Sequence, residues 1–289
     1  MWRDLLRAVI ELIYPPRLQC PLCGAQSPDN SLCLDCRQLL DGYAGEQVCC
    51  LCGGFLGVRG YHLDGLVYPT PGDSALLREQ PPGYEDKLIS CGSVNRLGAS
   101  LSQSSWLMCP ACRAENRPFD LARAVAPYEG PVREAVQRLK YRGMKSLAVP
   151  LGELMANASL REGAFARTDA LVPVPMHPGR ERERGYNQSV LLARALGELL
   201  QVPVLERVLV KIRETPSQTS LSASQRRKNL QQAFVVAKPE PVKGKILTII
   251  DDVFTTGSTV SIISHLLRQA GARSVLVLTF AGTRQSGKK

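Results

Sequence analysis

The sequence has no long uninterrupted apolar run, few aromatic residues and no recognisable export signal. No stretch approaches the roughly 18 apolar residues that a transmembrane helix needs, so we expect no membrane span. Aromatic residues make up only 6% of the chain, which disfavours direct stacking on nucleic-acid bases. The opening "MWRDLLRAVIELIYPP" has apolar residues at helical spacing, but Arg7 and Glu11 interrupt them and no small-residue cleavage site follows. We therefore expect a short amphipathic helix over residues 1–18 and a cytoplasmic protein.

The size and charge of the chain limit its class. With 289 residues it can bury one full core and carry a smaller module. The net charge of +10 favours attraction to polyanions, either phosphorylated small molecules or nucleic acid. A solvated basic surface without a specific partner is the alternative.

The cysteines follow a pattern. All ten are expected to be reduced thiols, because no export signal accompanies them. Eight form four CxxC pairs, namely Cys20/Cys23, Cys33/Cys36, Cys49/Cys52 and Cys109/Cys112. The first two pairs are close enough to supply one tetrahedral structural zinc site, whereas a long stretch separates the last two, so one or two Zn²⁺ ions are expected. Redox pairs or unliganded cysteines are the alternatives, but a redox CxxC would not repeat four times. Cys50 and Cys91 fall outside the pattern; Cys91 could substitute as a ligand, but a bystander role is favoured.

The composition and the hydrophobic pattern of the chain change near residue 119. Residues 53–108, inside a cysteine-rich region over residues 19–118, are rich in glycine, proline and serine and indicate a long loop or insertion. Residues 119–289 alternate between strand and helix patterns, which predicts an α/β domain with a parallel sheet and helices on both faces. Strands are expected in "ARAVAPYEG", Asp169–Pro175, Lys245–Asp252 and "RSVLVLTFAG", and helices in "PVREAVQRLKYRG", "QSVLLARALGELL" and "STVSIISHLLRQAG".

The stretch "TIIDDVFTTGST" (residues 248–259) carries the clearest chemistry. A loop of small residues follows a strand and opens a helix near Ser258, so its backbone N–H groups converge on a point suited to a phosphate. The residues of this predicted cradle are Thr255, Thr256, Gly257, Ser258 and Thr259. A Walker loop is excluded because no Gly-Lys-Ser/Thr is present. The alternative is a strand that ends in aspartate before an ordinary helix cap.

Two adjacent carboxylates precede this loop. Asp251 and Asp252 would repel a bare anion, so they make sense if they hold sugar hydroxyls or magnesium attached to the phosphate. The pair therefore predicts a ribose 5-phosphate ligand, with the acids accepting hydrogen bonds from ribose hydroxyls.

Four separated stretches together resemble one known family. They are "LKYRG", "VPVPMHPGRERERGYNQS", "RETPSQTSLSASQRRKNLQQAF" and "IIDDVFTTGST". The last resembles the phosphoribosyl pyrophosphate signature of type I phosphoribosyltransferases, and the whole chain resembles the ComF (ComF/GntX-like) family, in which an N-terminal double zinc ribbon precedes a phosphoribosyltransferase domain. The resemblance implies the type I phosphoribosyltransferase fold with Mg²⁺ and phosphoribosyl pyrophosphate as ligands. The spacer before Cys109 is longer than is usual in that family.

The resemblance also assigns site residues. It implies Lys140 in "LKYRG", and Gln218 and Arg226 in a Ser/Thr-rich hood, as ligand-binding positions. In an extended loop Arg180, Arg182 and Arg184 would share one side and grip pyrophosphate oxygens, unless they form a solvated charge run.

Asn187 belongs to the same motif of the family, but it fits equally well as the cap of the next helix. His177 and His265 are expected to be surface or packing residues, because nothing near them in the sequence points to catalysis.

Two functions stay open at this point. The first, which the family resemblance implies, is a magnesium-dependent phosphoribosyltransferase (pentosyl transfer) in DNA uptake and natural competence. The second is a non-catalytic zinc-ribbon adaptor that binds single-stranded DNA or a DNA translocase, with the ribose-phosphate pocket serving regulation. The sequence names neither the acceptor nor the oligomeric state.

Overall fold

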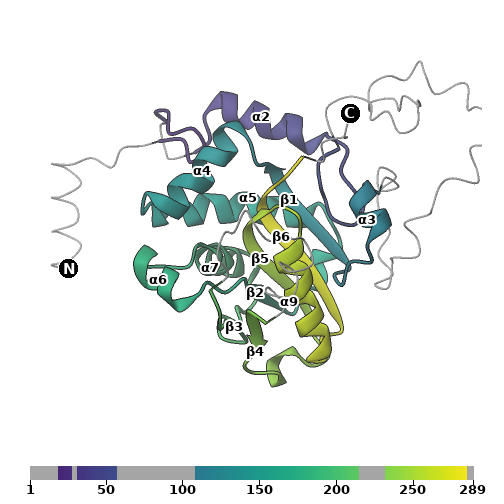
Figure 1. Cartoon of the computed structure of the whole chain (residues 1–289). Coiled ribbons are helices and arrows are strands. Elements are labelled where there is room, and N and C mark those ends of the chain that lie inside the picture. The colour runs from purple at the N-terminus through teal and green to yellow at the C-terminus, as the bar shows by residue number, and fades with distance from the viewer. Residues whose placement is uncertain (1–18, 28–30, 57–107, 215–231, 285–289) are drawn as a thin grey trace, which may run out of the picture.

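The computed structural model describes residues 19–27, 31–56, 108–214 and 232–284, and Figure 1 shows their arrangement. The helix predicted over residues 1–18, Cys91 with most of the predicted insertion, and Gln218 and Arg226 lie outside the described residues. Among the described residues, no helix combines the length and apolar character needed to cross a membrane.

A four-stranded parallel sheet forms the centre of the fold. Its strands are β1 (Leu121–Pro127), β2 (Ala170–Pro173), β5 (Ile246–Phe254) and β6 (Ser274–Gly282), in the order β1-β6-β5-β2. The two central strands, β5 and β6, are almost entirely buried, which is why both read as continuous apolar runs. Phe254 pairs with Gly282, so the carboxyl ends of these strands lie together at one edge of the sheet.

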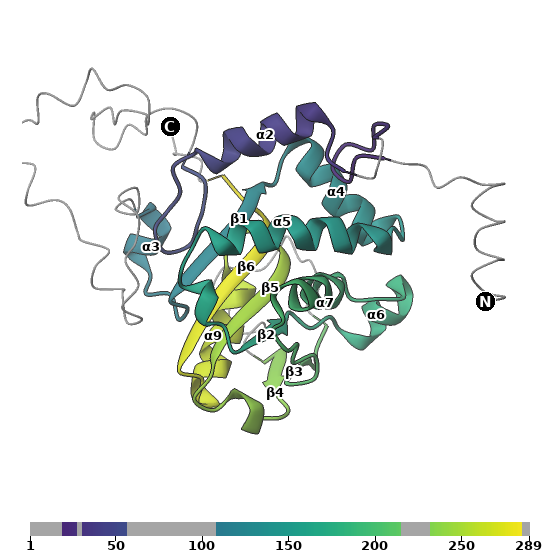
Figure 2. The same ribbon diagram turned by 180° about the vertical axis from the view of Figure 1, so that it is seen from behind.

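Helices cover both faces of the sheet (Figures 1 and 2). One face carries α4 (Gly130–Tyr141), α5 (Ala148–Leu160) and α7 (Gln188–Leu200). The other carries α9 (Ser258–Gln269) and the antiparallel strands β3 (Leu209–Lys211) and β4 (Phe234–Val236). Alternate β6 residues serve each side: Leu276 and Leu278 pack in the first core, and Val275 and Val277 in the second. Short 3₁₀ helices span Lys145–Leu147, Phe165–Arg167 and Glu240–Val242.

The helix ends follow their local sequence. Asn187 caps α7 by accepting from Ser189 N at 3.0 Å, which is one of the two roles that the sequence left open for it. Pro131 lies in the first turn of α4, and Gly271 follows α9 with a left-handed φ of 96°.

The cysteine-rich module contains α2 (Leu34–Ala44) and α3 (Pro110–Ala114) and packs directly on the sheet domain. Arg138 Nη2 of α4 donates to Pro21 O at 2.8 Å, and Ala122 N of β1 donates to Leu51 O at 2.8 Å. Residues 53–56 complete the turn that carries Cys49 and Cys52, because Val48 and Phe55 form an antiparallel bridge across it. The predicted fold class, a parallel sheet flanked by helices with a small N-terminal cysteine-rich module, is confirmed.

Candidate functional site

The two adjacent aspartates lie near the carboxyl end of β5 and have different partners. Asp251 Oδ1 accepts from Ser189 Oγ at 2.8 Å and from Asp252 N at 2.9 Å. Asp252 is only 3% exposed, and its Oδ2 lies 2.7 Å from Lys140 Nζ. The family resemblance alone had singled out Lys140, and the structure brings it to the acidic pair from α4.

Burial governs the electrostatics of this group. Burial, reinforced by the neighbouring Asp252 carboxylate, raises the pKa of Asp251 to about 7, against the opposing effects of Lys140 and Ser189. Burial also disfavours the charged form of Lys140, but Asp252 outweighs it and holds the Lys140 pKa above its ordinary value. Lys140 therefore neutralises Asp252, whereas the ionised form of Asp251 would be stabilised by any hydrogen-bond donor or cation that approaches it.

The loop between β5 and α9 has the geometry expected of an anion cradle. Gly257 has a left-handed φ of 76°, and a Cβ at this position would lie 2.6 Å from Cζ of the Phe254 ring, so only glycine fits. Thr256 Oγ1 and Ser258 Oγ are 2.8 Å apart at the start of α9, and Thr255 and Ser258 are exposed. The first N–H groups of α9 have no intrahelical acceptor, and the helix dipole adds positive charge there.

Two contacts hold this loop from outside. Arg117 Nη1 donates to Thr256 O at 3.3 Å, and Thr283 Oγ1 donates to Thr255 O at 3.0 Å. The loop is therefore fixed by residues that precede β1 and follow β6.

A pocket of about 530 Å³ opens beside Lys140. Its walls include Lys140, Tyr141, Arg180, Glu183, Arg184, Tyr186 and Glu214. Arg184 Nη1 donates to Gln188 Oε1 at 2.6 Å, and its guanidinium lies 5.1 Å from the centre of the Tyr141 ring. Arg180 pairs with Glu214 at 2.8 Å. Three cations thus face one space together with the carboxylates of Glu183 and Glu214, and Lys140 links this space to Asp252. The cations can bind a multiply charged anion.

The prediction that Arg180, Arg182 and Arg184 share one side of an extended loop was wrong. These residues form helix α6 (Pro178–Arg184), with Pro178 in its first turn and His177 Nδ1 accepting from Gly179 N at 3.2 Å. In a helix, residues four apart lie on one face, so Arg180 and Arg184 line the pocket, whereas Arg182 is exposed and is not among the pocket walls. Proline at the start and Gly185 at the end were the signals for this helix.

Sequence reasoning missed several residues of the site. Ser189 donates to Asp251, but its place at the end of a family motif was its only signal in the sequence. Tyr141 and Tyr186 line the pocket, and no spacing rule would have found them. Lys211 on β3 is also near: its burial, and next the positive charge of Arg180, lower the pKa of Lys211.

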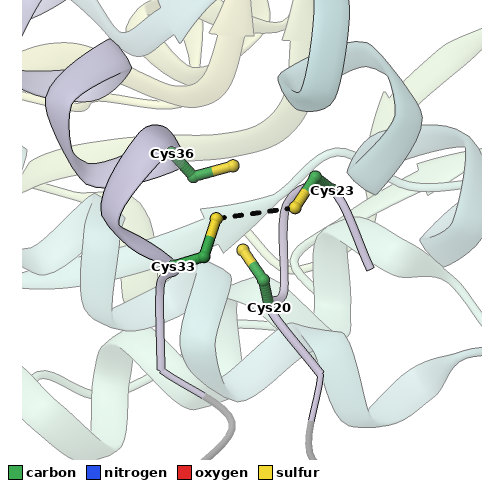
Figure 3. A group of neighbouring side chains, drawn as sticks. All are labelled: Cys20, Cys23, Cys33 and Cys36. Atoms are coloured by element: carbon green, nitrogen blue, oxygen red, sulfur yellow. Dashed lines mark hydrogen bonds between the residues drawn. The ribbon is translucent and has the colours of Figure 1, made fainter. Parts of the chain in front are cut away.

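The eight paired cysteines form two tetrads. Cys20, Cys23, Cys33 and Cys36 point toward one another in Figure 3, and Cys49, Cys52, Cys109 and Cys112 form the second group. Within each tetrad all sulfurs lie within 4.8 Å of one another, as a tetrahedral zinc site with four thiolates requires. The second tetrad therefore assembles despite the long spacer. Cys50 is buried beside it without belonging to it.

Comparisons with known proteins agree with both modules. The family model described as a double zinc ribbon domain matches residues 9–64. The chain is 32% identical over 173 residues to Competence protein F of Haemophilus influenzae, covering 58% of this chain and 76% of that protein. It is 35% identical over 176 residues to the DNA utilization protein YhgH of Escherichia coli K12, covering 60% and 77%. Competence protein ComFC of Bacillus subtilis is 24% identical over 274 residues, covering 88% and 90%.

Solved structures similar to the chain include the glutamine phosphoribosylpyrophosphate amidotransferase of B. subtilis, with a TM-score of 0.35, 19% identity and coverage of 50% of this chain and 30% of that one. A purine phosphoribosyltransferase from Pyrococcus horikoshii matches with a TM-score of 0.30, 15% identity and coverage of 46% and 72%. The similarity to Competence protein F covers more than two thirds of that protein at over 30% identity, and both cysteine tetrads are present. The chain therefore belongs to the ComF family, together with Competence protein F and the DNA utilization protein YhgH.

Proposed function

We propose that the chain binds phosphoribosyl pyrophosphate with magnesium as a phosphoribosyltransferase-type protein, in the cytoplasm, where it takes part in the handling of DNA during uptake. The observation that carries the proposal is the position of the buried acidic pair: Lys140, which pairs with Asp252, lines the cationic pocket, and the small-residue loop at the start of α9 follows the pair in the chain. The names of the relatives support the connection with DNA.

Each part of the ligand has a matching part of the site. The loop Thr255–Thr259 would hold the 5-phosphate through backbone N–H groups, and Asp251 would accept from the ribose hydroxyls while Lys140 keeps Asp252 neutralised. The pyrophosphate would lie against Lys140, Arg180 and Arg184, because guanidinium groups bind phosphate oxygens in bidentate fashion. Hard oxygen ligands from Asp251 and the pyrophosphate suit magnesium, which would offset the charge of the leaving group.

The proposed reaction is the transfer of a pentosyl group. The bond between C1 of the ribose and the pyrophosphate oxygen would break with its electron pair leaving on pyrophosphate, and positive charge would develop at C1. A nitrogen nucleophile would form the new bond to C1 and release its proton to the departing pyrophosphate. The protein would supply orientation through Asp251 and stabilise the departing pyrophosphate through the three cations.

Titration calorimetry with magnesium and phosphoribosyl pyrophosphate tests the proposal, and α6 offers a matched pair of variants. Arg184→Ala should weaken binding about tenfold or more, since Arg184 lines the pocket, whereas Arg182→Ala removes the same charge from an exposed face of the same helix and should change it less than about twofold. Ribose 5-phosphate should bind Arg184→Ala nearly as well as the unaltered chain. Absence of heat with the unaltered chain, or equal losses in the two arginine variants, would contradict the proposal.

Binding of single-stranded DNA is the second candidate. Tyr141 is 72% exposed, and the Arg184 guanidinium lies over its ring, which leaves an aromatic face beside a cationic pocket. A base stacked there, with phosphates on the arginines, would account for a DNA-handling role without turnover. Fluorescence anisotropy with a labelled oligonucleotide should show affinity that falls steeply with salt and falls again in Tyr141→Ala. Binding that is absent at low salt, or unchanged in that variant, would exclude this face.

A further inference from the structure

A short connecting segment, residues 113–119, joins the second cysteine tetrad to β1 and contacts the phosphate-binding loop. Its Arg117 has a side chain that is 11% exposed, pairs with Glu115 at 3.6 Å and donates from Nη1 to Thr256 O at 3.3 Å. Arg117 thereby fixes the peptide next to Gly257, at the centre of the proposed cradle. Its guanidinium also brings positive charge to a loop proposed to hold an anion.

A pair of aromatic rings makes the second contact. Phe119 is 2% exposed, and its ring meets that of Phe254 edge to face, with ring centres 6.1 Å apart and an interplanar angle of 86°. The Phe254 ring lies against Gly257, where no Cβ fits. Both phenylalanines share one buried core with the four cysteines of the second tetrad. Packed side chains therefore run without a break from the tetrad to the loop.

The segment is tied at both ends. At its start, Cys109 N donates to Cys49 Sγ at 3.3 Å, and Arg113 N donates to Cys109 O at 3.1 Å. At its end, Arg268 in the last turn of α9 donates from Nε to Pro118 O at 2.6 Å. The segment thus touches the loop that precedes α9 and also the far end of that helix.

We propose that zinc at the second tetrad and an anionic sugar phosphate at the Thr255–Thr259 loop favour each other's binding, with Arg117 and Phe119 as the positioning residues that link them. Zinc holds Cys109 and Cys112 in place, and without it the segment loses the anchor that aligns Arg117 with Thr256. Because linkage is reciprocal, a bound sugar phosphate must raise the affinity for zinc by the same factor. The inference rests on the proposed function, since it assumes that the loop binds phosphate.

The test measures zinc binding at equilibrium. The zinc-loaded chain is incubated with graded concentrations of a chelator, with or without saturating ribose 5-phosphate. Free thiols are then alkylated and mapped by mass spectrometry, so that Cys109 and Cys112 report the second site separately from Cys33 and Cys36. Ribose 5-phosphate should raise the chelator concentration at which Cys109 and Cys112 become half alkylated by about fivefold or more.

Two arginine variants identify the route. Arg117→Met keeps the apolar stem but removes the donor, so it should weaken ribose 5-phosphate binding about 3- to 10-fold and abolish most of the shift in zinc retention. Arg113→Met removes a neighbouring guanidinium that donates to Met108 O and not to the loop. This variant should therefore behave like the unaltered chain.

Each result has a distinct meaning. If the unaltered chain binds ribose 5-phosphate but its zinc retention does not change, the linkage is wrong and the proposed function stands. Equal effects of the two variants would also overturn the role of Arg117. If calorimetry shows that ribose 5-phosphate does not bind at all, the proposed function and the linkage both fall.

Discussion

Replacement of Asp251 by asparagine should stabilise the ligand-free protein at alkaline pH. Burial and the adjacent Asp252 raise the pKa of Asp251 from its ordinary value of 3.8 to about 7 in the folded protein. Between these two values the folded state binds a proton that the unfolded state does not, so the free energy of unfolding falls as pH rises from about 4 to about 7. Above pH 7 the folded protein carries the full cost of an ionised, buried carboxylate.

The size of the effect follows from the same rise in the pKa of Asp251. At about 1.4 kcal/mol for each tenfold change, a rise from 3.8 to about 7 corresponds to at most about 4 kcal/mol. Asparagine removes the charge and keeps an oxygen for Ser189 Oγ and Asp252 N, but a neutral oxygen accepts less strongly than a carboxylate by about 1–2 kcal/mol. The net gain for Asp251→Asn at pH 8 is therefore at most about 2–3 kcal/mol.

Urea denaturation followed by circular dichroism from pH 5 to pH 8.5, without added ligand or magnesium, measures this gain. The difference between Asp251→Asn and the unaltered chain should grow with pH and level off above about 7. Asp169→Asn is the matched control: Asp169 accepts from Ile246 N at 2.8 Å at the other end of β5, and its variant should lose stability. A loss of stability in Asp251→Asn that is the same at every pH would refute the reasoning.

Further predictions concern the loop, the ion pair and the metal sites. Gly257→Ala should cost about 1–3 kcal/mol in thermal unfolding because of its left-handed φ and the Phe254 ring, whereas Gly163→Ala, with nothing within 4 Å, should be nearly neutral. Lys140→Met leaves the Asp252 charge buried and should cost about 2–4 kcal/mol in urea denaturation at pH 8, whereas Lys243→Met, from the exposed pair with Glu240, should cost less than about 1 kcal/mol. Metal analysis should find one zinc for each tetrad, and Cys112→Ser should lower the content by one and reduce the melting temperature. A full zinc content in Cys112→Ser would argue against the second site.

The elements predicted best were those with purely local signals. The helix expected in "QSVLLARALGELL" corresponds to α7 (Gln188–Leu200), because its apolar spacing and its Asn187 cap lie in one short stretch. The acidic pair and the small-residue loop were likewise predicted from adjacent residues: the pair lies within β5 near its carboxyl end, and the loop stands between β5 and α9.

What the sequence could not predict depends on contacts between distant segments. The second tetrad joins Cys52 to Cys109 across the longest spacer between cysteine pairs, and only the folded chain shows the two sulfurs 3.7 Å apart. The contacts of Ser189 with Asp251 and of Arg117 with Thr256 also join residues far apart in the chain. Helix α6 was misread because alternating Arg and Glu suggested an extended segment, whereas its proline and glycine ends determine the helix.

A crystal structure of the protein with magnesium and phosphoribosyl pyrophosphate tests the central claim most directly. The account predicts the 5-phosphate against Thr255–Thr259, ribose hydroxyls on Asp251, and the pyrophosphate between Lys140, Arg180 and Arg184. The ligand bound elsewhere, or reversed so that the pyrophosphate occupies the loop before α9, would contradict it.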